Sequence, residues 1–312
     1  MKKVLVLGAS GGMGYALVME LASRGIEVIA FARNKEKLDE LFGHMSLVTT
    51  VSGDIFIIES LMKAATGVDS IFHAANIPYS QWHVKLRQLV SNIIKVSEAQ
   101  STKLIFADSI YSYGRKPNEL VREDSPKYPH TVKGKLRLEN EQLIKQSTVP
   151  TLIAHFPDFY GPHASNTLLH FTLNPVAKNK KTRFIGDPTI AREFIYTPDG
   201  AKALVNLALT EKAYHQNWNI PAYDVITGEE IIKILREELN YEKKVSIVTK
   251  GMIQFLGLFS KNMREVVEMF YLNEEPVILS GEKYEAEIGR LPKTPYKDGI
   301  IATINQIKQQ QI

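Results

Sequence analysis

The sequence predicts a doubly wound α/β fold, in which helices cover both faces of a parallel sheet, followed by a smaller mixed α/β lobe. Three observations support this. Residues 4–7 form an apolar run without alternation, as expected for a strand buried on both faces. A glycine-rich turn over residues 8–14 connects this strand to a helix. Strand and helix signals then alternate through the first half, which favours parallel strands with right-handed crossovers.

The elements of the first half follow one another closely. We expect strands at residues 27–32, 47–51, 70–74, 104–107 and 151–155, and helices at residues 14–23, 81–100 and 132–146, with a polar helix ending near residue 41. The regularity weakens after Gly161-Pro162. Residues 163–191 contain few clear elements, whereas 198–209 and 227–239 predict helices and 218–220 a strand.

The turn after the first strand has the composition of a nucleotide-binding loop. It contains four glycines in seven residues, which an ordinary strand-to-helix turn rarely needs. Such a turn brings backbone N–H groups close to a pyrophosphate at the positive end of a helix. The cofactor-binding residues expected here are Gly8, Ser10, Gly11, Gly12, Met13 and Gly14. No Gly-Lys-Ser/Thr follows, which argues against a phosphoryl-transfer loop.

The end of the second strand indicates which dinucleotide is bound. An acid at this place holds the ribose of NAD, whereas an arginine accommodates the 2′-phosphate of NADP. The chain has Ala32-Arg33-Asn34, without a carboxylate, so we expect NADP, with NAD as second choice. Arg33 could also be an ordinary surface arginine. Asp54 could contact the adenine or simply make a turn, and Ala74 and Ala75 could admit the cofactor or pack.

Composition narrows the class of protein. The chain is 44% hydrophobic and 23% charged, as in globular proteins, and has a net charge of +4. It contains no cysteine, and its histidines show no metal-binding spacing, so we expect no disulfide and no metal site. Basic residues are dispersed and apolar runs are short, so we expect a cytoplasmic protein bound to neither nucleic acid nor membrane.

Several motifs together identify a family resemblance. They are Gly8-x-x-Gly11-x-x-Gly14, Asp54, Phe72-His73-Ala74-Ala75, Asn92, the segment Ser109–Gly114, the segment Pro157–Pro162 and the segment Arg192–Asp199. In these motifs, over nearly its whole length, the chain resembles the extended short-chain dehydrogenase/reductases, the NAD-dependent epimerase/dehydratase family. The resemblance implies a Rossmann domain over residues 1–162, with 192–212 packing back onto it. It also implies a substrate lobe formed by residues 163–191 and 213–312.

The resemblance also implies functions for single residues. Ser109 corresponds to the catalytic Ser/Thr, and Pro157 lies in a motif beside the cofactor. Arg192 corresponds to an arginine that holds an anionic substrate group such as a phosphate. The substrate is then a small carbonyl or hydroxyl compound, with a nucleotide sugar as one option. Dimers are common in this family, which leaves a homodimer open.

The chain departs from the family at the Tyr-x-x-x-Lys pair. The run in register is Thr131-Val132-Lys133-Gly134-Lys135, in which Lys135 matches and Thr131 replaces tyrosine. A threonine hydroxyl is a poor acid or base near neutrality. Three alternatives follow: Tyr111 supplies the proton, with Tyr113, Tyr128 and His130 as weaker candidates; Ser109 and a water handle it; or the protein binds NADP(H) as a regulatory or redox-sensing protein without turnover.

The sequence thus predicts an oxidoreductase or epimerase whose candidate catalytic residues are Ser109, Lys135 and Tyr111. Two apolar stretches, Met252–Phe259 and Met263–Leu272, carry methionines and aromatics at helical spacing, as in core packing, a lid or an oligomer face. The basic cluster Lys178–Arg183 is most simply a solvated loop.

Overall fold

A seven-stranded parallel sheet forms the centre of the protein, which confirms the doubly wound prediction. The computed structural model describes residues 1–310, apart from the side chains of residues 261–263. The strand order is β11-β7-β5-β4-β1-β2-β3. The strands are β1 (Lys3–Leu7), β2 (Glu27–Ala32), β3 (Val48–Ser52), β4 (Ser70–His73), β5 (Lys103–Ser109), β7 (Thr151–Phe156) and β11 (Gln216–Asn219).

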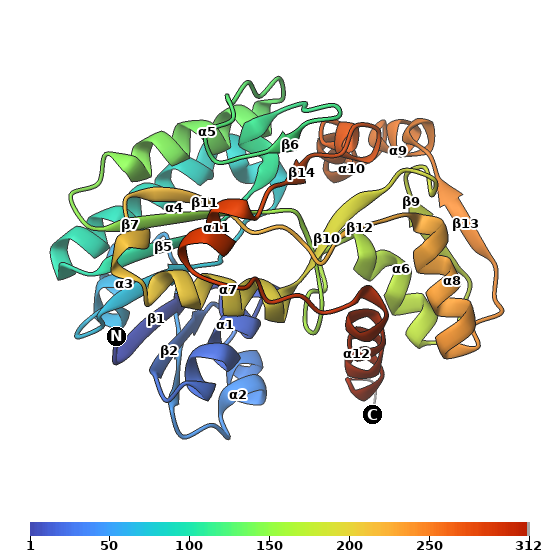
Figure 1. Cartoon of the computed structure of the whole chain (residues 1–312). Coiled ribbons are helices and arrows are strands. Elements are labelled where there is room, and N and C mark those ends of the chain that lie inside the picture. Colours follow the sequence, from blue (N-terminus) through green and yellow to red (C-terminus); the bar gives the residue numbers. More distant parts are fainter. Residues whose placement is uncertain (311–312) are drawn as a thin grey trace.

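Helices cover both faces of this sheet (Figure 1). One face carries α1 (Gly12–Ser23), α2 (Lys35–Phe42) and α7 (Thr197–Ala208); the other carries α3 (Ile58–Ala64), α4 (Tyr79–Gln100) and α5 (Val132–Lys145). Strand β1 shows why the sheet needs helices on both of its faces. Its alternate residues Val4 and Val6 belong to the core under α1 and α7, while Leu5 and Leu7 belong to the core under α3 and α4. Burial on both faces explains the unbroken apolar run.

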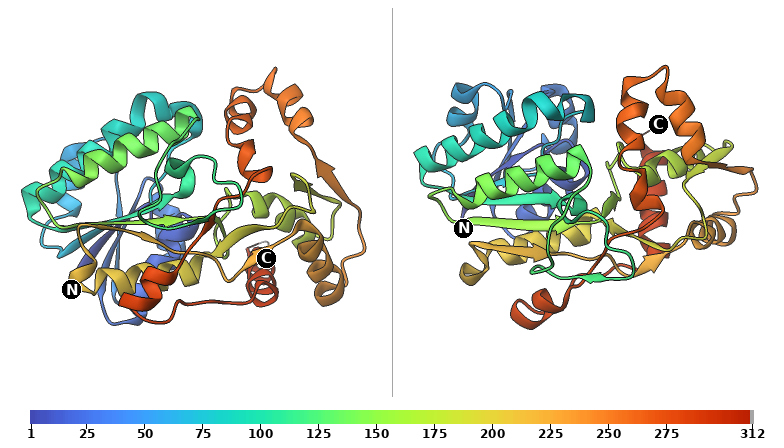
Figure 2. Two further views of the ribbon diagram at one scale, coloured as in Figure 1. Left: turned by 45° about the horizontal axis from the view of Figure 1, so that its top comes forward. Right: turned by 90° about the horizontal axis from the view of Figure 1, so that it is seen from above.

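The second half of the chain, together with the short strand β6, forms small sheets and helices beside the large sheet (Figure 2). The strands are β6 (Leu120–Val121), β8 (Asp158–Tyr160), β9 (Thr182–Ile185), β10 (Arg192–Tyr196), β12 (Val225–Ile226), β13 (Val245–Val248) and β14 (Ile278–Leu279). The helices are α6 (Leu168–Ala177), α8 (Gly228–Leu239), α9 (Lys250–Gly257), α10 (Lys261–Val267), α11 (Glu282–Glu287) and α12 (Tyr296–Gln309). The two apolar stretches therefore contribute α9 and α10.

Three differences from the predicted elements have physical causes. Strand β11 lies in the range expected for the second lobe, but it pairs with β7 and extends the large sheet. Helix α3 is only seven residues long, too short for a clear helical period. Helix α6 occupies a stretch where we expected few elements. Thr167 caps it and its sequence is apolar on most sides, so no amphipathic pattern marks it.

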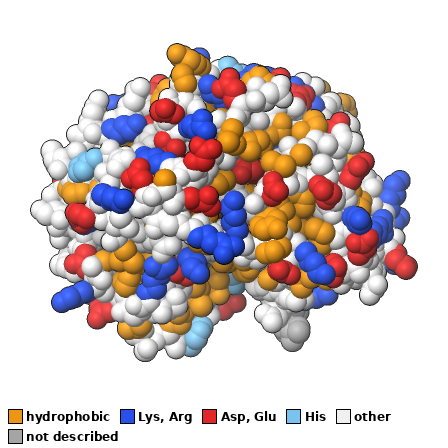
Figure 3. Space-filling model, viewed as in Figure 1, with side chains coloured by type: hydrophobic (Ala, Val, Ile, Leu, Met, Phe, Trp, Pro, Cys, Tyr) orange, Lys and Arg blue, Asp and Glu red, His pale blue; other side chains and the backbone are white. Residues whose placement is uncertain are grey.

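The surface carries charges of both signs, and on the face in Figure 3 they are interspersed rather than gathered by sign. Among residues 1–310, we find no helix whose length and hydropathy would let it cross a membrane. The basic cluster at residues 178–183 lies mostly outside: only Thr182 is buried there, and the lysines and Arg183 are exposed. Lys178 to Lys181 precede β9, whereas Thr182 and Arg183 belong to that strand and pair with β13, so the cluster is solvated but is not entirely a loop.

Glu193, on β10, is a buried carboxyl that ties three segments together. Its two carboxyl oxygens accept hydrogen bonds from the backbone N–H groups of Ala222 (3.0 Å) and Leu279 (2.9 Å). Burial raises the pKa of Glu193 from 4.5 to about 7, although the two N–H donors oppose this shift. Between these pH values the folded protein holds a proton that the unfolded chain has lost.

This difference predicts that the Glu193 contribution to stability falls as pH rises from about 4.5 to about 7 and then levels off, by roughly 1.4 kcal/mol per unit of pKa difference. Glu193→Gln cannot ionise, so it should lose this component although it is less stable overall. The measurement is the urea-unfolding free energy at pH 5 and pH 8. Glu229→Gln, on the exposed face of α8, is the control. Parallel pH profiles for wild type and Glu193→Gln would contradict the assignment.

Candidate functional site

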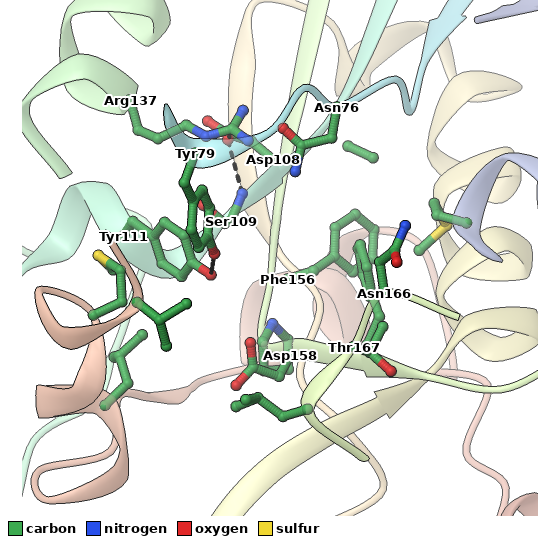
Figure 4. A pocket seen from close by; sticks show the side chains of 18 of the residues that line it. Asn76, Tyr79, Asp108, Ser109, Tyr111, Arg137, Phe156, Asp158, Asn166 and Thr167 are labelled. Carbon is green, nitrogen blue, oxygen red and sulfur yellow. Dashed lines mark hydrogen bonds and ion pairs between the residues drawn. The ribbon is translucent and has the colours of Figure 1, made fainter. Parts of the chain in front are cut away.

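A cavity of about 270 Å³ lies at the carboxyl ends of β1, β4, β5 and β7. This is the edge of a doubly wound sheet at which ligands bind. Its walls include Met13 from α1, Ala74 and Ala75 after β4, and Pro157 after β7. Residues from α6 and from the segment after α10 close the opposite side. The sheet edge and the second half of the chain thus form the cavity together (Figure 4).

The glycine turn is packed too tightly for side chains. Gly8 has a φ of +82°, and a Cβ on it would lie 2.5 Å from the Cα of Ala75. A Cβ on Gly14 would lie 2.1 Å from the carbonyl oxygen of Gly8, and one on Gly12 2.6 Å from the Cα of Ala164. Since a non-bonded approach this close is strongly repulsive, these three positions require glycine for packing.

Gly11 differs from the other glycines of the turn. It is exposed, and the nearest atom to a Cβ there would be the Gly8 oxygen at an ordinary 3.4 Å. Helix α1 then begins at Gly12 without a capping side chain, so its first N–H groups are available to an anion. Ser10 lies in the same turn. The turn thus combines an open side with uncapped donors, which fits a pyrophosphate.

At the end of β2, Arg33 is exposed and forms no ion pair with any described residue. The neighbouring Asn34 caps α2 by accepting a hydrogen bond from the N–H of Lys37. Asp54, after β3, is partly exposed, and one of its oxygens accepts a hydrogen bond from the N–H of Phe56 at 2.9 Å. This is the turn contact considered as an alternative, and it leaves the second oxygen of Asp54 without a described hydrogen bond.

Two hydroxyl-bearing residues line the cavity after β5. The Ser109 Oγ is buried and has no hydrogen-bond partner among the described residues, which is unusual for a buried polar atom. The Tyr111 hydroxyl lies 2.7 Å from that of Tyr79, which comes from the start of α4 (Figure 4). Burial, reinforced by Tyr79, raises the pKa of Tyr111 well above 10. Tyr111 therefore keeps its proton near neutrality.

Helix α5 contributes Arg137 to the cavity. The Arg137 guanidinium lies 3.0 Å from the carboxylate of Asp108 and 4.4 Å from the centre of the Trp82 ring. Its Nε is buried without a described partner. Lys135 is exposed and does not line the cavity. The structure thus brings Arg137, and not the predicted Lys135, to Ser109 and Tyr111.

Helix α5 offers a second pair with the same four-residue spacing, two residues beyond Thr131 and Lys135. Thr131 is the N-cap of α5, and its hydroxyl accepts a hydrogen bond from the N–H of Gly134 at 3.0 Å. Lys133 and Arg137 are four residues apart, and both lie on the side of α5 that faces the protein interior. Lys133 is 2% exposed. The periodicity of buried residues along α5 would have given this register, because Lys133 and Glu141 are buried whereas Lys135 and Glu139 are exposed.

Lys133 does not line the cavity but connects α5 to the segment that covers it. Its Nζ lies 2.6 Å from the carboxylates of both Glu265 and Glu268. Glu268 also accepts hydrogen bonds from the N–H groups of Val132 and Lys133 at the positive end of α5. Val266 and Met269, on the same segment, line the cavity. We call this arrangement of Lys133, Glu265 and Glu268 the α5–α10 clamp.

Arg192 lines the cavity as the motif suggested, but its guanidinium already has partners. It donates to the carboxylate of Asp158 and to the side-chain oxygen of Asn273, both of which line the cavity too. Only 8% of the Arg192 side chain is exposed. Tyr79, Arg137 and Asp158 are site residues that the sequence reasoning missed. Asp158 was visible within the Pro157–Pro162 motif, whereas no pattern marked Tyr79.

A buried polar group supports the segment that carries Ser109 and Tyr111. His155 Nδ1 lies 3.2 Å from the carbonyl oxygen of Ser109, and His155 Nε2 lies 2.9 Å from Lys127 Nζ. Glu141 pairs with Lys127 at 2.5 Å. Burial lowers the pKa of His155 to about 4, so this histidine is neutral near pH 7. Among the described residues, no group of three or more acids or histidines is placed to hold a metal ion.

Comparison with known proteins identifies the family. The sequence profile of the NAD dependent epimerase/dehydratase family matches residues 4–220. The chain belongs to the NAD-dependent epimerase/dehydratase family. It is an enzyme of this family and binds NAD(P). The match covers the whole large sheet, including β11, together with the glycine turn, Ser109 and Arg137.

Curated relatives of this epimerase/dehydratase family enzyme are distant. The spore coat polysaccharide biosynthesis protein SpsK of Bacillus subtilis is 28% identical over 216 residues, which cover 66% of this chain and 70% of SpsK. The uncharacterized protein YLL056C of Saccharomyces cerevisiae is 24% identical over 246 residues, covering 76% and 80% of the two chains.

Solved structures share the fold over the full length. UDP-glucuronic acid 4-epimerase from Bacillus cereus, in complex with NAD, has a TM-score of 0.80 at 19% identity and covers 99% of this chain, with 100% of its own chain covered. The dTDP-glucose 4,6-dehydratase of Bacillus anthracis, also in complex with NAD, has a TM-score of 0.81 at 16% identity. The match covers 100% of this chain and 98% of the dehydratase chain. At these identities the likeness concerns the fold.

Proposed function

We propose that this enzyme is an NADP(H)-dependent oxidoreductase that reduces a small carbonyl compound. The observation that carries the proposal is the meeting of Ser109, Tyr111 and Arg137 in one cavity with the end of the glycine turn. Two hydroxyl groups at the ligand-binding edge of a doubly wound sheet are suited to act on a carbonyl oxygen, and Arg137 beside them is suited to hold the cofactor.

The residues present fit a dinucleotide. Gly11 leaves open space where the uncapped start of α1 presents its N–H groups, and Arg33 offers an unpaired guanidinium at the end of β2. Gly8, Ser10, Gly12, Met13 and Gly14 complete the turn. Ala74, Ala75 and Pro157 line the cavity with little bulk, and Asp54 is the candidate for the adenine. A bound NADPH would supply the hydride for reduction.

The hydroxyl groups of the chain polarise the substrate oxygen and supply a proton. Ser109 Oγ has no hydrogen-bond partner among the described residues, so it is available to donate a hydrogen bond to a carbonyl. Tyr111 is protonated near neutrality because its pKa is raised. The Tyr79 hydroxyl lies 2.7 Å from the Tyr111 hydroxyl, where it can return a proton to Tyr111 after transfer. Tyr111 is therefore present in the protonated form that donates a proton to a developing alkoxide, as reduction requires, whereas the phenolate that would act as a base is not.

In this proposal Arg137 takes the place expected for Lys135 and holds the nicotinamide half of the cofactor. Its partly unsatisfied guanidinium can donate to ribose hydroxyls. Arg137→Met should weaken NADPH binding at least about tenfold, equivalent to roughly 1.4 kcal/mol. The matched variant Lys135→Met, on the same helix but exposed, should bind like wild type. Equilibrium titration of NADPH fluorescence measures both. The opposite ranking of the two variants would restore Lys135 to the site.

We assign the preference for NADPH over NADH to Arg33. Arg33→Asp removes the guanidinium and adds a charge that repels a 2′-phosphate, so the ratio of NADH to NADPH affinity should rise by about tenfold or more. Arg87→Asp, exposed on α4, makes the same charge change away from the site and serves as the control. Titrations with NADPH and NADH give the two dissociation constants. An unchanged ratio would remove Arg33 from the assignment.

Deuterium tracing tests the proposed function itself. The protein is incubated with NADPH deuterated at the transferable position and a small-molecule extract, and labelled metabolites are sought by mass spectrometry. We expect a labelled product with wild type and, since Ser109 polarises the oxygen, a rate reduced about 100-fold or more with Ser109→Ala. Tight NADPH binding without any labelled product would instead favour a regulatory NADP(H)-binding protein.

A further inference from the structure

The lining of the cavity is mostly apolar, although the polar side chains of Asn166, Thr167 and Asn273 and the Asp158–Arg192 pair lie among the apolar ones. Phe159 and Phe171 line it on one side, and Val266, Phe270 and Leu272 line it on the side of the clamp segment. Phe171 is 59% exposed and so stands at the rim. The side chains of Ser109 and Tyr111 line the same cavity at the sheet edge. A ligand that fills this cavity therefore meets these two hydroxyl groups and a mostly apolar wall.

The charged residues that line the cavity, within the described part of the chain, cancel in pairs. They are Asp108, Arg137, Asp158 and Arg192, and each arginine lies against one aspartate. Arg192 is held on three sides, by Asp158, by the Asn273 oxygen and by the Phe194 ring at 4.8 Å. Neither arginine is therefore a free cation for a substrate phosphate.

An anionic substrate would meet two costs here. It would approach Arg192 beside the Asp158 carboxylate, so the attraction of one would be offset by the repulsion of the other. It would also exchange water for a wall of phenylalanines and leucine, which do not compensate a phosphate. A nucleoside diphosphate sugar therefore does not suit the charge of this cavity.

We propose that the substrate is an uncharged carbonyl compound with an apolar arm, and that Asp158 is the specificity-determining residue that excludes nucleotide sugars. The carbonyl oxygen faces Ser109 and Tyr111, while the apolar arm lies along Phe159 and Phe270. Asp158 neutralises Arg192, which would otherwise attract a diphosphate. This inference rests on the proposed function, because it specifies the substrate of the same cavity.

Equilibrium binding tests the substrate class separately from turnover. Protein saturated with NADP⁺ is titrated by calorimetry with UDP-glucose and, separately, with 4-phenyl-2-butanone and 2-octanone. We expect wild type to bind at least one ketone and to bind UDP-glucose at least about 100-fold more weakly. Micromolar binding of UDP-glucose to wild type, or binding of neither ketone, would overturn the inference.

Charge-removing variants test Asp158. Asp158→Asn has nearly the same shape but leaves Arg192 as a net cation, so its affinity for UDP-glucose should rise about tenfold or more over wild type. Asp158→Ser makes the same charge change with a smaller side chain, in case the first variant does not fold. Glu229→Gln changes the net charge equally from an exposed position on α8 and should bind UDP-glucose like wild type. An equal gain in the Glu229 variant, or no gain in either Asp158 variant, would remove Asp158 from the role.

Turnover separates the two proposals. If NADPH oxidation is absent with every ketone that binds, the proposed reduction fails while the binding data still identify the substrate class. If NADPH oxidation proceeds only with a nucleotide-linked keto sugar, which has the carbonyl group that UDP-glucose lacks, the function stands and the substrate class is overturned.

Discussion

The tight packing of the β1–α1 turn against the end of β4 is the constraint on which the site depends. Gly8 touches the backbone of Ala75 so closely that only hydrogen fits between them, and Gly14 packs equally closely on the Gly8 oxygen. This contact places the start of α1 directly beside β4 at the carboxyl edge of the sheet. The uncapped N–H groups and the floor of the cavity at Ala74 and Ala75 are consequences of the same contact.

A second constraint is electrostatic. Each arginine in the cavity is buried only with an aspartate beside it, because an unpaired buried charge would be costly. The same rule holds for Lys133 in the α5–α10 clamp, which is neutralised by two carboxylates. The positively charged side chains near the site therefore form ion pairs with carboxylates of the same protein. Hydroxyl groups and apolar surface remain for a ligand.

The sequence was sufficient for the large sheet because buried parallel strands and a glycine turn leave strong local patterns. It was insufficient for the α5 register. In a stretch with Lys133, Lys135 and Arg137, a spacing of four residues can be matched in two ways, and only the buried face distinguishes them. Nor could it show that Arg192 pairs with Asp158, since that contact joins separate strands that meet only in the folded protein.

Helix α5 connects these observations. Its inner face presents Arg137 to the cavity and, one turn earlier, Lys133 to the clamp. Arg137 is the residue of α5 that lines the cavity, and an arginine keeps its proton near neutrality, so the proton donor must come from another element. Tyr111 is in the cavity, and although Arg137 acts to lower its pKa, burial outweighs this effect and keeps the pKa well above 10. A donor of that kind suits reduction better than a cycle that also needs a base.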